Sequence, residues 1–400
     1  MYDIIIIGSG PSGLFASANI KNKKILLLEK NEILGKKLLV SGSGQCNLTH
    51  SGDIKDFFNH YGQKKNYVKK ILLRFSNVDL IKYFNQRGLD FIVDENGKYF
   101  PKSLKSKDLM NVLIDEIYNN NVEIMLSKKV TKISKEKDFS VYCGEKKYIA
   151  KNVVIATGGK SYPVLGTTGD GYEFAETLGH KIISTKPSLT SLNIENFNYK
   201  ELAGTSFKNA KISISNKLSN IGDLLITHKG FSGPCVLDFS RYIYDGDIIY
   251  ISFLNLIKEK FSNILYNKLL ENPKKDIFNI LKDFDFTKKF LYFILNELKI
   301  NYKELACNLN KKDRNAIVDY FIEKPFKVST VNGFDSAMVT SGGIDTFEID
   351  SKTMQSKLVE GLFFCGEIID VDGDTGGYNI QFAFSTAKII SDFFNGGENN

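Results

Sequence analysis

The first thirty residues combine a short apolar run with closely spaced glycines. Residues 2–7 read YDIIII, a pattern typical of a fully buried strand. Residues 8–13 follow at once and read GSGPSG, and a helix-like stretch then continues to about Lys21. A second apolar run, KILLLE, ends at Glu29. This order of strand, glycine turn, helix, strand and acidic residue predicts a Rossmann-type βαβ unit that binds an adenine dinucleotide.

Each glycine of this G-x-G-x-x-G turn has its own physical role. Gly8 permits the tight turn, Gly10 lets the backbone approach a pyrophosphate, and Gly13 lets the helix pack closely on the strand. The start of the helix directs free N–H groups toward the phosphates, and Glu29 is placed for the ribose hydroxyls. A carboxylate there disfavours a 2′-phosphate, so NADP is not the expected ligand of this site. The expected contacts in this unit are Gly8, Gly10, Pro11, Ser12, Gly13, Glu29 and Lys30.

Two later segments distinguish FAD from NAD as the dinucleotide. Residues 153–159 read VVIATGG and residues 361–367 read GLFFCGE, and each is a strand that ends in glycine. In this order the pieces resemble the FAD-binding domain of the glutathione-reductase-type flavoproteins. The resemblance implies that the last 70 residues fold back onto the first 190. A second framed G-x-G-x-x-G is lacking, so a nicotinamide, NADH or NADPH, is expected only as a transient co-substrate beside the flavin.

Longer stretches narrow the resemblance to one family. Together they resemble the aminoacetone-oxidase family of FAD-binding enzymes, also labelled BaiN/RdsA-type NAD(P)/FAD-dependent oxidoreductases. The family implies an α/β fold: a discontinuous Rossmann-like FAD-binding domain with an inserted β-barrel-like part and an inserted helical part. The stretches are GKKLLVSGSGQCNLTH (35–50), GKYFPKSLKS (97–106), ATGGKSYPVLGTTGDGYEFAETLGH (156–180), THKGFSGPCVLDFSR (227–241) and TMQSKLVEGLFFCGEIIDVDGDTGGYNIQFAFSTAK (353–388).

The chain departs from the family pattern at two places. Gln45 stands where the family usually has an arginine, which removes a fixed cation near the flavin or substrate. Residues 49–50 are Thr-His, where the family motif usually ends in Thr-Asn.

The sequence pattern in the middle of the chain predicts the two inserted parts, one of strands and one of helices. Short strands with glycine turns between residues 207 and 254 indicate antiparallel β structure, and residues 255–323 have helical periodicity. We therefore expect an FAD domain over 1–190 and 328–400, a β part over 191–254 and a helical part over 255–327. Basic residues exceed acidic ones in the helical part, which fits either a solvated surface or a surface that faces RNA.

Residues 35–47, GKKLLVSGSGQCN, are too rich in glycine for a good helix. We expect this loop to wrap the pyrophosphate and ribityl chain and to bring Cys46 toward the flavin ring. Cys46 is then either a small buried filler or the proton donor to the reduced substrate. Lys37 is either a phosphate contact or a solvated lysine. Further expected cofactor contacts are Ser41, Gly42, Val130, Thr157, Gly158, Gly366 and Glu367.

The C-terminal stretch 370–387, DVDGDTGGYNIQFAFSTA, predicts a helix from about Tyr378. Its N-terminus is expected to face the flavin edge that becomes negative on reduction. Gly377 opens this helix, the N–H groups of Asn379 and Ile380 are the expected donors, and Asp370 is placed for a ribityl or phosphate-side hydroxyl.

Two histidines have possible roles that their neighbours in the sequence suggest. His228, in THKGFSGP, is either an acid–base group or a turn residue. His180 follows a glycine at an expected helix end, where an imidazolium suits the helix dipole, and we interpret it as structural.

Composition limits the partners, metal sites and cellular compartment that can be expected. The net charge of +7 reflects either a lysine-rich coding bias or an anionic partner such as RNA. Five cysteines are scattered without a C-x-x-C pair, and only four histidines are present, so neither disulfides nor a metal site is expected. The start of the chain predicts no signal peptide, and the apolar runs are too short to predict a membrane helix. The expected compartment is the cytoplasm.

Three functions stay open. The leading one is an FAD-dependent reductase in which a nicotinamide reduces the flavin and an electron-poor C=C accepts hydride. Uridine in large-subunit ribosomal RNA is its leading substrate. The second is an aminoacetone-type amine oxidase that uses oxygen, and the third is a flavin-carrying RNA-binding or assembly factor.

Overall fold

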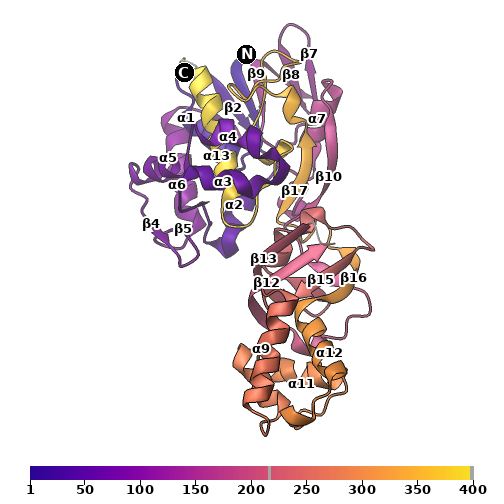
Figure 1. Cartoon of the computed structure of the whole chain (residues 1–400). Coiled ribbons are helices and arrows are strands. Elements are labelled where there is room, and N and C mark those ends of the chain that lie inside the picture. The colour runs from indigo at the N-terminus through magenta and orange to yellow at the C-terminus, as the bar shows by residue number, and fades with distance from the viewer. Residues whose placement is uncertain (215–217, 397–400) are drawn as a thin grey trace. The chain divides into compact units, whose positions relative to one another are not determined.

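The computed structural model describes residues 1–214 and 218–396. The chain divides into two compact units. The first unit contains Met1–Ser188 and Gly333–Asn400, and the second contains Leu189–Asn332. The first unit thus combines the two ends of the chain, and the second is an insertion between them (Figure 1).

The core of the first unit is a seven-stranded sheet in the order β6-β2-β1-β9-β8-β7, with β18 paired to β9. Strand β1 is parallel to both of its neighbours, and its isoleucines 4–7 are at most 4% exposed. The strands are β1 (Tyr2–Ile7), β2 (Ile25–Leu28), β6 (Glu123–Met125), β7 (Lys132–Lys135), β8 (Phe139–Cys143), β9 (Lys146–Ile155) and β18 (Leu362–Phe364). The carboxyl ends of β1, β2, β9 and β18 therefore meet at one edge, the usual place for a ligand in such sheets.

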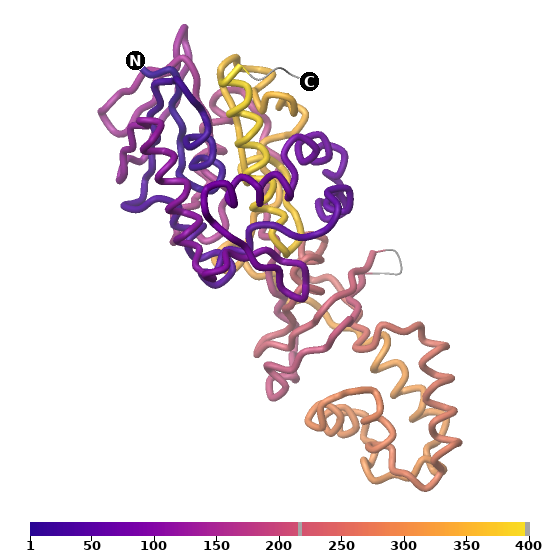
Figure 2. The backbone as a smooth tube through the Cα atoms, turned by 90° about the vertical axis from the view of Figure 1, so that its left-hand side faces the viewer, coloured from indigo at the N-terminus to yellow at the C-terminus, as the bar shows by residue number. Residues whose placement is uncertain are grey.

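Helices from both ends of the chain cover this sheet. The C-terminal helix α13 packs against α1, and Phe384 meets Phe15 edge-on with ring centres 5.1 Å apart. Figure 2 shows α13 in yellow among the indigo and purple N-terminal segments. The helices are α1 (Pro11–Asn19), α2 (Lys36–Val40), α3 (Ile54–Phe57), α4 (Lys65–Leu72), α5 (Asn77–Asn85), α6 (Ser106–Asn119), α7 (Asp170–Thr177) and α13 (Tyr378–Phe394).

Two small antiparallel sheets complete the first unit. One has the order β3-β5-β4 and the other pairs β10 with β17. Their bounds are β3 (Thr49–His50), β4 (Phe91–Val93), β5 (Lys98–Pro101), β10 (Ile182–Ser188) and β17 (Val339–Ile344). Among the described residues, parallel strand pairs therefore belong to the seven-stranded sheet alone, and no second dinucleotide-binding sheet accompanies it.

The second unit is a closed antiparallel barrel with helices attached. The barrel order is β11-β14-β13-β12-β15-β16. Its strands are β11 (Leu192–Ile194), β12 (Ser206–Ile214), β13 (Leu218–Ile226), β14 (Gly230–Ser232), β15 (Ile248–Ser252) and β16 (Lys324–Val331). The helices are α8 (Pro234–Leu237), α9 (Lys258–Glu271), α10 (Ile277–Leu281), α11 (Lys288–Glu297) and α12 (Lys311–Ile322). Barrel and helices share one hydrophobic cluster.

The boundaries within the insertion differ from those that the sequence predicts. Strand β16 spans residues 324–331, so it crosses the expected boundary at 327/328 and closes the barrel after the helices. The helical part is therefore enclosed by the β part rather than following it. In the described part of the chain, no helix has both the length and the apolar character needed to cross a membrane.

Candidate functional site

The turn between β1 and α1 is tight enough to require two of its three glycines. Gly8 has φ +99°, and a Cβ there would lie 2.6 Å from the carbonyl oxygen of Ala156. A Cβ on Gly13 would lie 1.9 Å from the carbonyl oxygen of Gly8. The close packing of α1 on β1 and β9 thus accounts for glycine at positions 8 and 13 within the protein itself.

Gly10 is different, because nothing in the protein requires a glycine there. Its backbone is extended, with φ −69°, and a Cβ would come no closer than 4.0 Å to another residue. Pro11 occupies the first turn of α1, and the N–H groups of Gly10, Ser12 and Gly13 find no acceptor among the described residues. Free donors beside an unobstructed backbone are what a pyrophosphate needs.

Glu29 lies at the end of β2 and is only 7% exposed. Its carboxylate accepts hydrogen bonds from the N–H of Ser9, at 2.9 Å, and the N–H of Asn31, at 2.7 Å. The N–H of Lys128 donates to the carbonyl oxygen of Glu29 at 2.9 Å, and Val130, two residues further on, is buried. These contacts hold Glu29 against the glycine turn after β1, at the edge of the sheet.

Lys30 is held by a neighbour that the sequence did not reveal. Its ammonium lies 2.8 Å from Asp170 and donates to the hydroxyl of Thr168 at 2.6 Å. Burial alone would raise the pKa of Asp170, but the hydrogen bonds from Lys30 and Thr168 outweigh it and hold that pKa below its usual value. Lys30 therefore ties the end of β2 to the start of α7.

The loop 35–47 contains a short helix, contrary to the expectation from its glycine content. Helix α2 (Lys36–Val40) forms because KKLLV lacks glycine and the chain enters through Gly35 at φ +61°. A tight turn over Ser41–Gly44 follows, in which Gly42 has φ +54°. The hydroxyl of Ser41 donates to the carbonyl oxygen of Leu38 at 2.7 Å, so it caps α2.

Lys37 pairs with Glu367 rather than standing free. The two charged groups are 2.8 Å apart, and Glu367 also accepts the N–H of Thr340 at 2.9 Å. This ion pair joins α2 to the turn after β18, so two predicted cofactor contacts from opposite ends of the chain meet here.

The turn after β18 also touches the glycine turn after β1. Ser12 Oγ donates to the carbonyl oxygen of Cys365, and a Cβ on Gly366 would lie 2.6 Å from that hydroxyl. The N–H of Gly366 itself donates to Thr386 at 3.0 Å. The first and last segments of the chain therefore form one continuous surface around the free N–H groups of α1.

The end of β9 carries an unsatisfied hydroxyl. Thr157 Oγ1 is buried and has no hydrogen-bond partner in the described part of the chain, and Gly158 follows it with φ +72°. The hydroxyl of Tyr172 on α7 is also buried without a partner there. Burial raises the pKa of Tyr172 far above its usual value, so this phenol stays neutral. Buried polar atoms of this kind need an explanation, and a bound ligand supplies one.

The N-terminus of α13 faces the loop 35–50. Gly377 has φ +98°, and a Cβ there would lie 2.7 Å from the Cα of Thr49. The side chain of Asn379 closes the preceding turn by accepting the N–H of Gly373 at 2.7 Å. Among the described residues, the backbone N–H groups of Asn379 and Ile380 have no acceptor, as at the open end of any helix. Asp370 pairs with Lys64.

The two predicted proton donors have very different environments. Cys46 is fully buried, and burial raises the pKa of its thiol to about 12. This favours the interpretation of Cys46 as a packing residue. His228 is exposed in the turn between β13 and β14, within the second unit.

His60 belongs to this region but was missed by sequence reasoning. Its Nδ1 lies 3.0 Å from Asp374, and its ring stacks on Tyr378 with centres 4.1 Å apart. The side chain is 39% exposed, and its Nε2 has no partner among the described residues. No local motif marks His60; only the scarcity of histidines in the chain could have drawn attention to it.

His50, which departs from the family pattern, packs against the same tyrosine. Its ring stacks on Tyr378 with centres 5.5 Å apart, and its two nitrogens each lie 2.8 Å from a backbone carbonyl oxygen, of Ser51 and of Asn96. His50 therefore holds β3 against α13 and the turn before β5.

These residues fit a dinucleotide cofactor whose central part, a pyrophosphate and a ribityl chain, is long and polar. The unobstructed Gly10, the free N–H groups of α1 and α13, and the orphaned hydroxyl of Thr157 all lie in the first unit. Groups of three or more potential metal ligands are absent from the described residues.

Comparison with known proteins agrees with this geometry. Residues 2–392 match the family described as HI0933-like protein Rossmann domain. The chain is 32% identical to the ribosomal RNA dihydrouridine synthase of Escherichia coli, with 96% of each chain covered. It is 28% identical to the 3-dehydro-bile acid delta(4,6)-reductase of Clostridium scindens, with 97% of this chain and 98% of the relative covered.

Solved structures share the fold at low sequence identity. The 3-ketosteroid delta1-dehydrogenase of Sterolibacterium denitrificans has a TM-score of 0.54 at 13% identity, with 99% of this chain and 100% of that chain covered. The quinol fumarate reductase subunit FrdA of E. coli has a TM-score of 0.51 at 14% identity, with 99% and 70% covered. The chain belongs to the HI0933-like family and is an FAD-dependent oxidoreductase.

Proposed function

We propose that this protein reduces the C5=C6 bond of a uridine in large-subunit ribosomal RNA to give dihydrouridine, with NADH or NADPH as the electron donor. The observation that carries the proposal is the relationship, over 96% of both chains, to a protein named ribosomal RNA dihydrouridine synthase. The bile-acid relative also has a name that describes reduction of carbon–carbon double bonds. Saturation of an electron-poor C=C is thus the reaction class that the two relatives share. A ribosomal RNA substrate implies action in the cytoplasm.

In the proposed site, FAD would be held along the edge where β1, β2, β9 and β18 end. Its pyrophosphate would lie over Gly10 and the N-terminus of α1, and Glu29 would bind the ribose. Thr157 and Asp370 would meet hydroxyls of the ribityl chain. When bound, FAD supplies the redox chemistry by accepting hydride from the nicotinamide and delivering it to carbon.

The protein's own contribution is to orient the cofactor and supply a proton. The N–H groups of Asn379 and Ile380 would stabilise negative charge at the ring edge that faces α13. Addition of hydride to a C=C also needs a proton on the neighbouring carbon. His60 is suited to transfer this proton through Nε2, because Asp374 engages Nδ1 and orients the ring with Nε2 left free. His228 is the other candidate for this role.

The decisive experiment is a map of dihydrouridine in ribosomal RNA from a strain that lacks the gene and from its parent. We expect one dihydrouridine to disappear in the deletion strain and to return when the gene is supplied on a plasmid. An unchanged map would rule out the ribosomal RNA reductase.

Reactions of the purified protein separate the remaining alternatives. Rapid anaerobic bleaching of the yellow protein by NADPH or NADH is expected for a reductase. Hydrogen peroxide formed from aminoacetone and oxygen, without bleaching by a nicotinamide, would instead identify an amine oxidase. RNA binding with neither reaction would identify a flavin-carrying assembly factor.

A further inference from the structure

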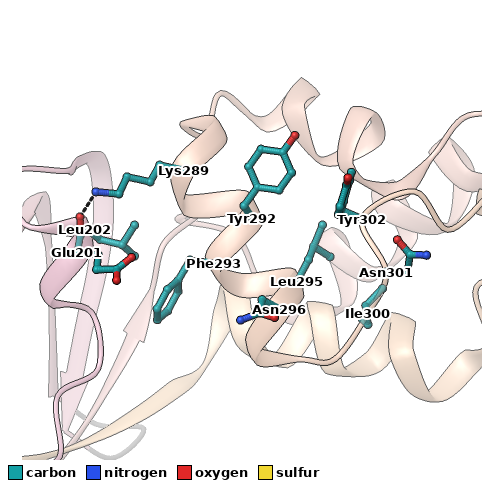
Figure 3. Close-up of a pocket in the computed structure, with 10 residues that line it drawn as sticks. All are labelled: Glu201, Leu202, Lys289, Tyr292, Phe293, Leu295, Asn296, Ile300, Asn301 and Tyr302. Carbon is teal, nitrogen blue, oxygen red and sulfur yellow. Dashed lines mark hydrogen bonds between the residues drawn. The ribbon is translucent and has the colours of Figure 1, made fainter.

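The helical part of the second unit contains a cavity of about 560 Å³. It lies beside α11 and the turn that follows this helix, and residues of the segment 200–202 form its other side (Figure 3). The lining residues are Glu201, Leu202, Lys289, Tyr292, Phe293, Leu295, Asn296, Ile300, Asn301 and Tyr302. Aromatic rings, two amides and a lysine therefore surround one hollow.

Two tyrosines at this cavity are solvent-accessible but fixed in orientation. Tyr292 is 46% exposed and Tyr302 is 40% exposed. The ring of Tyr292 stacks on the buried Phe278, with centres 4.3 Å apart and an angle of 25°, and it meets Tyr302 edge-on at 5.2 Å. In the described part of the chain, neither phenol oxygen forms a hydrogen bond. Such rings offer a rigid apolar surface that loses little entropy when a flat ligand stacks on it.

The lysines around the cavity lack acidic partners. Lys288, Lys299 and Lys303 are exposed and form no ion pair with a described residue. Some other lysines of the same unit are paired: Lys268 lies 2.9 Å from Asp283 and Lys327 lies 2.8 Å from Glu195. The ammonium of Lys303 lies 5.7 Å from the ring centre of Tyr302, and Lys288 and Lys299 are next in sequence to the lining residues Lys289 and Ile300.

Two further groups set the local charge. Lys289 donates to the backbone carbonyl oxygen of Glu201, a contact that leaves its charge uncompensated (Figure 3). Glu201 itself lines the cavity, and Glu304 follows Lys303 in the sequence. Lys200 and Glu297 also adjoin lining residues, so five lysines stand against three acids at this surface, a net charge of +2 that favours a polyanion. Asn296, whose amide makes no hydrogen bond to a described residue, can bind the edge of a base.

We propose that this surface, centred on Tyr292 and Tyr302, docks an unpaired segment of RNA by stacking its bases on the tyrosines and pairing its phosphates with the lysines. Exposed aromatic rings with neighbouring lysines are how single-stranded nucleic acid is bound. A duplex hides the faces of its bases, so the expected ligand is a loop or single strand. The inference rests on the proposed function, since it assigns the part of the chain that holds the RNA substrate.

The test uses the full-length, FAD-loaded protein and a fluorescein-labelled 12-nucleotide single-stranded RNA, measured by fluorescence anisotropy. We expect Tyr292→Ala/Tyr302→Ala to weaken binding by about 10-fold or more, because a base stacked on an aromatic ring contributes that much. Tyr292→Phe/Tyr302→Phe keeps the rings and should bind like the wild type. The same RNA in a perfect duplex should bind more weakly than the single strand.

Control variants show whether a loss of RNA binding comes from the altered surface or from misfolding of the protein. Tyr266→Ala removes a tyrosine of the same unit that is 45% exposed but does not line the cavity, and should leave RNA binding unchanged. Lys288→Glu/Lys299→Glu should weaken binding and flatten its dependence on salt concentration, with an unchanged melting temperature. Wild-type affinity in the alanine and glutamate pairs alike would overturn the proposal, as would equal loss in Tyr266→Ala.

The outcomes also separate this surface from the proposed reaction. If deletion of the gene leaves the dihydrouridine map unchanged but the tyrosine pair is needed for RNA binding, the docking surface stands and the reaction falls. If the map changes but the tyrosine and lysine variants bind RNA normally, the reaction stands and this surface is not the RNA site. Binding of an apolar peptide in place of RNA would likewise overturn it.

Discussion

The candidate FAD site in the first unit and the tyrosine surface in the second are built from different parts of the chain. The first depends on backbone atoms: a Cβ at position 13 would meet a carbonyl oxygen at 1.9 Å, and one at position 377 would meet a Cα at 2.7 Å. The second depends on two exposed side chains, Tyr292 on α11 and Tyr302 in the turn that follows this helix.

The difference predicts how each region tolerates change. A site of packed backbone fails when one methyl group is added, because the strands and helices around it would have to move. A surface of projecting side chains can be altered without loss of the fold. A family can therefore keep one cofactor site while its members act on different substrates, and the relatives named for ribosomal RNA and for a bile acid fit this pattern.

The largest effect is expected for Gly13→Ala. The new methyl group would overlap the carbonyl oxygen of Gly8, so α1 would have to leave the sheet. We expect a loss of more than about 4 kcal/mol in the free energy of unfolding, which leaves little folded protein. Circular dichroism and chemical denaturation measure it.

Gly246→Ala in the second unit is the control for Gly13→Ala. Gly246 has φ +90°, but a Cβ there meets nothing within 4 Å. Only backbone strain remains, about 1–2 kcal/mol. Equal effects of the two substitutions would mean that close packing does not set the first unit apart.

Gly10→Ala should separate the ligand from the fold. Its Cβ would be 4.0 Å from the nearest residue, so unfolding of the FAD-free protein should change by less than about 0.5 kcal/mol. The methyl group would instead occupy space that the pyrophosphate needs, weakening FAD binding by about 1–3 kcal/mol. Titration of apoprotein with FAD, followed by flavin fluorescence, checks this. Wild-type affinity would show that the pyrophosphate does not approach Gly10.

Much of the first unit could be predicted from the sequence because its function constrains local patterns. Strand β1, the glycine turn and the start of α13 near Tyr378 follow from short-range signals, namely buried apolar runs and glycines at fixed spacing. The family resemblance supplied the discontinuous domain, which no local pattern reveals.

What the sequence could not predict depends on long-range contacts. The Lys37–Glu367 and Lys30–Asp170 pairs join residues 330 and 140 positions apart. The return of the chain at β16 to close the barrel, and the contact of His60 with Asp374, likewise need the tertiary fold. The helix α2 was missed because neighbouring glycines masked four good helix formers, two lysines and two leucines.

Thr157→Val should have a smaller effect on FAD binding than Gly10→Ala, and it tests the role of a single hydroxyl group. Valine has the shape of threonine but lacks the hydroxyl that is buried without a partner. The FAD-free protein should be as stable as the wild type or more so, whereas FAD binding should weaken by about 2- to 10-fold because one hydrogen bond is lost. Isothermal calorimetry with FAD and thermal melts of the apoprotein measure both. Lower apoprotein stability with unchanged FAD affinity would assign the hydroxyl a structural role instead.

The smallest effect concerns His180, which the sequence suggested as an imidazolium at a helix end. The ring is 3% exposed, with Nδ1 2.9 Å from Glu348 and Nε2 2.8 Å from Ser356 Oγ. Burial lowers the pKa of His180, although Glu348 opposes this shift. Ser356 Oγ already accepts two backbone N–H groups, so its own hydrogen points to Nε2, and the buried ring is neutral.

A histidine whose pKa is lower in the folded state makes stability fall as the pH drops below the unfolded value of 6.5. The unfolded chain binds the extra proton, so the loss is at most about 1.4 kcal/mol per pH unit for this one group. We therefore expect the free energy of unfolding to fall less steeply between pH 7 and pH 5.5 in His180→Gln than in the wild type. The other titrating groups are the same in both proteins, so the difference between the slopes isolates His180. Parallel slopes would mean that the pKa of His180 is the same in the folded and unfolded states, so that burial has no net effect on it. A steeper fall in His180→Gln than in the wild type would mean that the ring is protonated in the folded state, as the position at the end of α7 first implied.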